Sequence, residues 1–181
     1  MKSPVAQADI STNISTAERK TMVVKGSAKV FDIFFDKVYS KKAKAVARET
    51  MTNADDAHRM VGTDRPFVVH LPDDLDPTFS VRDFGPGMSY EFMMGGYTEA
   101  FNSTKDEDNE QTGMLGIGSK AGLALSDAYT VTCYQGGRRW QYLVSRDEDR
   151  LPGVLPLTDV AGEPTDEPDG VEVQIPVADA L

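Results

Sequence analysis

Apolar residues recur at helical spacing in two stretches near the start of the chain. In SAKVFDIFFDKVYS (27–40), they repeat every three or four residues at Val30, Ile33, Phe34 and Val38. The next stretch, KKAKAVARETMTNADDAHRM (41–60), gathers a second set into one broad arc of a helix: Ala43, Val46, Ala47, Thr50, Met51, Ala54 and Ala57. Such a stripe is typical of an amphipathic helix that packs on a core. We therefore predict two consecutive helices, the second capped by Ser40 and ending at Gly62.

Elsewhere the apolar residues alternate or cluster in the short runs that are typical of strands. These runs are TMVVKG (21–26), RPFVVHLP (65–72), TFSVRD (78–83), DAYTVTCYQGG (127–137), RRWQYLVSR (138–146) and GVEVQIPV (170–177). The pair Gly136 and Gly137 predicts a β-hairpin between two of them, and Ser89 can cap a short helix over 89–94. Helices mixed with consecutive late strands predict an α+β fold with its helices on one face of a sheet.

Length and charge narrow the classes of protein. The 181 residues, 40% of them hydrophobic, predict one domain over 18–181 behind a flexible N-terminus at 1–17. The formal charge of −10 argues against broad nucleic-acid binding, because that requires a basic surface. The acidic stretches 104–112 and 147–169 lack apolar periodicity, so we expect solvated loops there. We see no transmembrane run and no signal peptide, and expect a cytoplasmic protein.

Three polar residues on the second predicted helix fit neither its apolar arc nor its charged one. Glu49, Asn53 and Asp56 follow one another at spacings of four and three residues, at the margin of the core face. The two carboxylates could be ordinary surface groups. Alternatively, a carboxylate and an amide one turn apart could hold Mg²⁺ and activate a water. The second interpretation requires phosphate-binding groups elsewhere in the chain.

The stretch SVRDFGPGMS (80–89) places Asp83 at the end of a predicted strand, before Gly85, Gly87 and Met88. Asp, Gly and Pro are common in tight turns, so a plain turn is one interpretation. The other is a binding loop for a flat ring. The glycines would let the backbone approach the ring, Asp83 would accept a hydrogen bond from an exocyclic amine, and Met88 would pack on the ring.

A second glycine-rich stretch, GMLGIGSKAG (113–122), precedes an apolar run and predicts a turn that leads into a helix. Backbone N–H groups at such a helix start can converge on an anion. The stretch lacks the Gly-Lys-Ser/Thr ending of P-loop NTPases, and it does not open the βαβ unit of a dinucleotide-binding fold. A phosphate turn of another kind is the remaining functional interpretation.

The order of these motifs resembles the GHKL ATPases, the superfamily of gyrase, heat-shock ATPase chaperones, histidine kinases and MutL. The resemblance covers roughly residues 45–177, and it implies a two-layer α/β sandwich with a mixed, mostly antiparallel sheet. The nearest likeness is to the N-terminal domain of phage T4 rIIA-like proteins, the protectors from prophage-induced early lysis. It is carried by VVHLPDDLDPTFSVRDFGPGMS, NSTKDEDN and GMLGIGSKAGLALSDAYTV. Because rIIA proteins are much longer, we expect this chain to be the N-terminal part of a longer protein or a shortened relative.

The resemblance implies a role for each motif residue in binding and hydrolysing ATP. Glu49 would be the general base, Asn53 the Mg²⁺ ligand, and Asp56 and Ala57 neighbours of the ribose and phosphates. Asp83 would read adenine beside a wall of Gly85, Gly87 and Met88. The phosphate turn would comprise Gly113, Leu115, Gly116, Ile117, Gly118, Ser119 and Lys120. The loop over 97–112 would close over ATP, with Lys105 as a phosphate contact.

Two departures from the family pattern limit what the resemblance implies. The usual Gly-Thr that supports the adenine-reading Asp is Gly170 and Val171 here. Many members of the family also take a Lys or Arg from a following domain, whereas this chain stops just after the late strand, so we expect slow hydrolysis. We expect an ATP-driven conformational switch, with lysis inhibition, dimerisation, phage or host partners and partner-mediated membrane association following only from the resemblance. The alternatives are a non-catalytic nucleotide-binding interaction module and a protein kinase of the GHKL class.

Several other reactive residue types carry no motif, and we expect structural roles for them. His58 lies toward the core side of its helix, and His70 lies in a strand. Cys133, the one cysteine, alternates with its neighbours in a strand and is expected to be a packed side chain. Arg82 should point to the opposite face of its strand from its neighbour Asp83, toward solvent.

Overall fold

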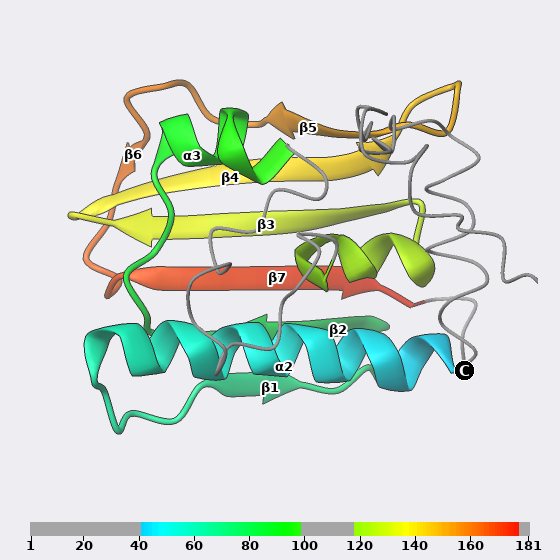
Figure 1. Cartoon of the computed structure of the whole chain (residues 1–181), viewed down its shortest axis with the longest axis horizontal. Coiled ribbons are helices and arrows are strands. Elements are labelled where there is room, and N and C mark those ends of the chain that lie inside the picture. Colours follow the sequence, from blue (N-terminus) through cyan, green and yellow to red (C-terminus); the bar gives the residue numbers. More distant parts are fainter. Residues whose placement is uncertain (1–40, 99–117, 178–181) are drawn as a thin grey trace, which may run out of the picture.

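The computed structural model describes residues 41–98 and 118–177, and these form a sheet with helices on one of its faces (Figure 1). The helices are α2 (Lys42–Val61) and α3 (Tyr90–Met94), with 3-10 helices η3 (Gly96–Thr98) and η4 (Gly118–Ala124). The strands are β1 (Val68–His70), β2 (Thr78–Arg82), β3 (Ala128–Gln135), β4 (Arg138–Arg146), β5 (Pro152–Pro156), β6 (Glu163–Pro164) and β7 (Gly170–Pro176). The α+β fold class expected from the sequence is thus confirmed.

The sheet of these strands has the order β1-β2-β7-β3-β4-β5, with β6 also paired to β4. Each pair of neighbouring strands in this part of the chain is antiparallel. The late strand β7 therefore lies between the early strand β2 and the hairpin strand β3. This places the end of β2, where the chain reaches Asp83, directly beside the start of β7.

Period-two alternation gives the sheet one apolar face and one polar face. Val81, Val173, Val131 and Tyr142 follow one another across the strands in register. Val81, Val131 and Tyr142 belong to the buried core, together with Phe79, Tyr129, Cys133 and Ile175, and the half-buried Val173 packs against it. The intervening positions carry polar side chains such as Ser80, Thr132, Glu172 and Gln174. The helices cover the apolar face, so any cavity between the two layers has an apolar floor.

Sequence periodicity located most of these elements correctly. Ser89 Oγ accepts a hydrogen bond from the N–H of Phe92 at 3.1 Å, as expected for the cap of α3. Gly136 and Gly137 have φ values of 59° and 74°, which suits a two-residue hairpin turn. α2 ends at Gly62 as predicted, but its N-cap is Lys41, which makes no side-chain cap hydrogen bond. Ser40, the residues before it and 99–117 lie outside the described residues.

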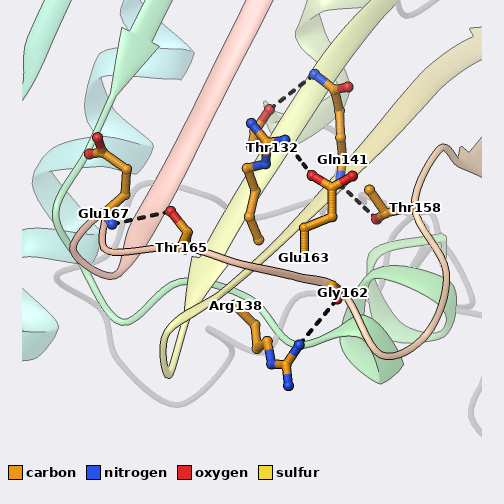
Figure 2. Close-up of polar contacts among 9 residues, drawn as sticks. Thr132, Arg138, Gln141, Thr158, Gly162, Glu163, Thr165 and Glu167 are labelled. Carbon is orange, nitrogen blue, oxygen red and sulfur yellow. Dashed lines mark hydrogen bonds and ion pairs between the residues drawn. The ribbon is translucent and has the colours of Figure 1, made fainter.

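The acidic stretch after β4 is not simply a loop, contrary to expectation. It contains β5 and β6, which both pair with β4. Figure 2 shows polar contacts that hold the stretch 147–169 against β4. In one of them, Thr158 Oγ1 accepts a hydrogen bond from the N–H of Gln141 at 3.2 Å. The prolines at the ends of β5 and the many acidic residues around it conceal the strand signal, because proline is confined to strand edges and ends.

The helix expected in the second glycine-rich stretch is present as the 3-10 helix η4, which begins at Gly118, inside that stretch. Gly122 faces the sheet so closely that a Cβ there would lie 2.8 Å from the Tyr129 ring. Glycines weaken an α-helix, and the short η4 instead packs tightly on β3. Among the described residues, no helix combines the length and the apolarity that crossing a bilayer requires.

Candidate functional site

A cavity of about 480 Å³ lies between the apolar face of the sheet and the helices. This volume is within the usual range for small-molecule sites. The sheet contributes Val81, Val131, Val171, Val173 and Ile175 to its wall, and the polar residues of the wall include Asn53, Asp56, Asp83, Ser119, Lys120 and Gln135. An apolar floor with a few polar groups at its margin suits a ligand that has both a flat apolar part and a charged part.

α2 supplies one side of the cavity through Asn53, Asp56 and Ala57. Asp56 is only 5% exposed, so it is not an ordinary surface carboxylate. Side-chain oxygens of Asn53 and Asp56 come from adjacent turns of one helix, and amide and carboxylate oxygens suit Mg²⁺. This donor set could provide one or two ligands to a Mg²⁺ ion that takes its other ligands from phosphates and water.

Glu49 lies one turn before Asn53, beside η4 and not among the residues that line the cavity. Its Oε1 is 2.6 Å from Nη2 of Arg48, and the side chain is 19% exposed. A Cβ on Gly118 would lie 2.8 Å from Oε2, so the carboxylate borders the start of η4, which does line the cavity. Glu49 is therefore close to the predicted phosphate turn. Because its carboxylate also contacts Arg48, its role as a general base stays a prediction.

Asp83 is the best-defined polar group of the cavity wall. Its Oδ1 accepts hydrogen bonds from the N–H of Gly85 at 2.9 Å and of Val171 at 3.1 Å. Among the described residues, Oδ2 has no hydrogen-bond partner. Burial raises the pKa of this carboxyl, while the two N–H donors and the nearby Arg82 and His58 oppose that rise. The fold thus fixes one carboxylate oxygen and leaves the other able to accept from a ligand.

In the last motif, Val171 stands in place of the Thr whose hydroxyl usually supports the aspartate. Here the backbone of Val171 makes the contact with Asp83 instead. Val171 has no hydroxyl, but its backbone N–H donates to Asp83 Oδ1 and its carbonyl accepts from the N–H of Asp83 at 2.8 Å. Gly170 makes this approach possible. Its φ is 137°, and a Cβ there would collide with the carbonyl of Asp83. The backbone of β7 therefore supports the aspartate directly.

The loop after Asp83 is held between α2 and the hairpin. A Cβ on Gly85 would lie 2.6 Å from Cβ of Ala57. These two predicted site residues therefore pack directly against each other, with no room for a side chain at Gly85. His58, buried at 7% exposure, accepts the N–H of Phe84 on its Nε2 at 2.7 Å. This contact confirms the structural role expected for His58, because it anchors the loop to α2.

Gly87 has a φ of 70°, and a Cβ there would collide with the carbonyl of Tyr134. We expect Gly87→Ala to destabilise the fold by more than about 2 kcal/mol, since it combines left-handed strain with a backbone clash. Gly136→Ala is the matched control. Its φ is 59° with nothing near the added Cβ, and it should cost about 1 kcal/mol. Urea unfolding of both variants measures the difference, and equal losses would contradict the tight approach of this loop to β3.

Lys120, on η4, is another polar residue of the cavity wall. The side chain is buried, its Nζ is 3.2 Å from Ser119 Oγ, and it lies 4.4 Å from the centre of the Tyr97 ring. Burial lowers the pKa of Lys120 to about 8. A cation at this position favours an anionic group in the cavity.

The structure brings most of the predicted site residues together. The cavity is lined by Asn53, Asp56, Ala57, Asp83, Gly87, Met88, Gly118, Ser119 and Lys120, with Gly85 packed behind Ala57. The predicted residues Lys105, Gly113, Leu115, Gly116 and Ile117 lie outside the described residues, as does most of the expected lid.

Arg82 corrects one expectation. It points away from the cavity, but it is buried rather than solvated, and it donates to the carbonyls of Asp83 and Pro168. Its guanidinium also lies 4.1 Å from the centre of the Tyr134 ring. Arg82 therefore braces the loop before β7 against the end of β2.

Two contacts that support the site escaped the sequence analysis: that of the Tyr97 hydroxyl and that of the Val171 backbone. Tyr97, expected at the start of the lid, instead lies buried in η3. Tyr97 donates from its hydroxyl to the carbonyl of Ser119 at 2.8 Å and so holds the start of η4. Nothing in the local sequence marks either contact. Neither the comparison with protein-family models nor the comparison with curated proteins gives a match to this sequence.

Proposed function

We propose that the cavity binds an adenine nucleotide, with Asp83 reading the base. The observation that carries this proposal is the state of the Asp83 carboxylate. Two backbone N–H groups hold Oδ1, while Oδ2 is left without a partner among the described residues, at the margin of an apolar cavity. The exocyclic amine of adenine is a donor that matches such an acceptor, and Met88 and Val173 offer apolar surface to the ring.

The phosphates would extend from the base toward η4. Gly118, Ser119 and Lys120 line that part of the cavity, and Asn53 and Asp56 border it from α2. Asn53 would hold Mg²⁺, which neutralises phosphate charge and orients the terminal phosphoryl group. Glu49, beside Gly118, would orient and deprotonate the attacking water. Asp56 and Ala57 would lie along the ribose and phosphates.

This assignment makes the protein an ATPase of the GHKL type with a two-layer α/β fold, related to phage rIIA-like proteins. Support comes from the three motifs in order and from an antiparallel sheet that carries its helices on one face. Slow hydrolysis would drive a conformational switch of the protein in the host cytoplasm. Dimerisation, phage or host partners and a role in lysis inhibition belong to the same proposal.

A second candidate is a module that binds nucleotide without hydrolysing it. The position of Glu49 favours this alternative, because the carboxylate is paired with Arg48 and does not line the cavity. The two candidates share the adenine site and differ only in whether Glu49 reaches the attacking water when nucleotide is bound.

Calorimetric titration of the chain with ATP and with GTP, each with Mg²⁺, tests the proposal. We expect ATP to bind at least about tenfold more tightly, because guanine presents an acceptor where adenine presents its amine. Phosphate release in the ATP sample then separates the two candidates. Equal binding of the two nucleotides, or no binding of either, would rule out adenine recognition at Asp83.

A further inference from the structure

The end of β3 carries a polar side chain that the proposed function does not use. Val131 and Cys133 on this strand face the helices and are buried in the core. Gln135, two residues further along, lies on the same face, because side chains alternate along a strand. It is half-buried and lines the cavity between the two layers. Its amide is therefore a polar group of the cavity wall that a ligand has to match.

One hydrogen bond fixes which way this amide is turned. Nε2 of Gln135 donates to the carbonyl of Pro86 at 3.1 Å. A carbonyl oxygen can only accept, so the amide nitrogen has to face it, and Oε1 takes the other corner of the amide. Among the described residues, Oε1 has no hydrogen-bond partner. Gln135 thus adds an acceptor to the cavity wall, as Oδ2 of Asp83 does.

Gln135 and Asp83 lie at the same end of the cavity. The loop after β2 contacts both side chains: the N–H of Gly85 donates to Asp83 Oδ1 at 2.9 Å. The next residue, Pro86, accepts from Gln135. In the sheet, the N–H of Val171 also donates to Asp83, and β3 pairs Val171 with the residue two positions before Gln135. This end of the cavity therefore has two acceptors.

We propose that Gln135 is a specificity-determining residue for the base, whose Oε1 accepts one hydrogen of the exocyclic amine while Asp83 Oδ2 accepts the other. This inference rests on the proposed function and deepens it. A primary amine carries two N–H hydrogens, so it can satisfy both acceptors, directly or through one water. A secondary amine offers one hydrogen, and an oxo group offers none. The site therefore selects purines with an unsubstituted 6-amino group over 6-alkylamino and 6-oxo purines.

Equilibrium titration with adenosine and with purine riboside, which has a hydrogen in place of the amine, tests this role. Gln135→Lys keeps a donor for the Pro86 carbonyl and removes the acceptor. It should weaken adenosine binding roughly three- to tenfold, the loss of one neutral hydrogen bond, and change purine riboside binding less than about twofold. Equal losses for the two nucleosides would show a structural role, and unchanged adenosine binding would overturn the inference.

Gln141→Lys is the matched control, because it adds the same charge on the other face of the sheet. Gln141 precedes the core residue Tyr142 on β4, so its side chain lies on the face away from the helices. It is outside the cavity wall. We expect this variant to bind both nucleosides like the native chain. A loss of adenosine binding equal to that of Gln135→Lys would assign the effect to the added charge and overturn the role of Gln135.

N6-methyladenosine gives a readout that a structural role would not move. The native chain should bind it at least about tenfold more weakly than adenosine, because the methyl group replaces one hydrogen and leaves an acceptor unpaired. Gln135→Ala removes that acceptor and leaves space for the methyl group, so the two ligands should then bind within about threefold of each other. A ratio that stays at tenfold in Gln135→Ala would contradict the assignment.

The same titrations separate a failure of this inference from a failure of the proposed function. Adenine recognition stands and this inference falls if Asp83→Asn loses the preference for adenosine over purine riboside whereas Gln135→Lys keeps it. If the native chain binds the two nucleosides equally, or binds neither, both proposals fall.

Discussion

Asp83→Asn should lower the affinity for ATP roughly 30- to 150-fold, or about 2 to 3 kcal/mol. The Asn side-chain oxygen can still accept the N–H groups of Gly85 and Val171, which now hold Oδ1 at 2.9 Å and 3.1 Å. Its NH₂ group then replaces Oδ2 and turns a donor toward the donor on adenine. The substitution therefore preserves the hydrogen bonds that hold the loop after Asp83. It changes only the group that faces the base, from a hydrogen-bond acceptor to a donor. Calorimetric titration with ATP measures the loss.

The control for this variant is Asp55→Asn, which removes the same charge from the exposed side of α2. Asp55 forms an ion pair with Arg59 at 2.7 Å and lies outside the cavity wall. We expect it to leave ATP affinity unchanged and to lower stability by no more than about 0.5 kcal/mol. If Asp83→Asn bound ATP as tightly as this control, Asp83 would not read the base.

Glu49→Ala should lower phosphate release at least about 100-fold and leave ATP affinity within about threefold. A general base acts in the transition state, so its loss affects turnover more than binding. Glu49 borders Gly118 without lining the cavity, which is why its removal should leave the nucleotide contacts intact. Single-turnover phosphate release and a parallel titration with ATP measure the two effects separately.

Glu91→Ala is the matched control, because Glu91 is an exposed glutamate in the first turn of α3. It should hydrolyse ATP at the native rate. If Glu49→Ala released phosphate as fast as Glu91→Ala, the chain would lack a base at this position, and the non-catalytic module would be the better account.

The elements that were predicted well are those whose pattern is local. α2 carries a long helical period, the β3–β4 hairpin is marked by Gly136 and Gly137, and β2 and β7 are short runs between turn residues. β5 and β6 were missed because they are edge strands with prolines, and their pairing with β4 depends on tertiary contacts. A helix was expected where η4 lies, but its 3-10 form and the close packing of Gly122 on Tyr129 depend on a tertiary contact that the sequence does not show.

The same division holds for the candidate site. The motif residues could be chosen from sequence because each lies in a recognisable pattern, and Asn53, Asp83 and Lys120 do line one cavity. The groups that support them were not predictable, because the partners are far apart in the chain. Val171 reaches Asp83 over 88 positions, and His58 reaches Phe84 over 26. Only the fold shows that Arg82 braces this region from the polar face.

The most direct test of the central claim is to locate the bound nucleotide in the native chain. Backbone amide NMR spectra recorded during a titration with ADP should shift at Asp83–Met88, Asn53–Ala57 and Gly118–Lys120, the three segments that surround the cavity. Peaks from the β4–β5 turn at Asp147–Leu151, far from these segments in sequence and outside the cavity wall, should stay in place. Unchanged spectra around Asp83 and Lys120 at saturating ADP would contradict the account.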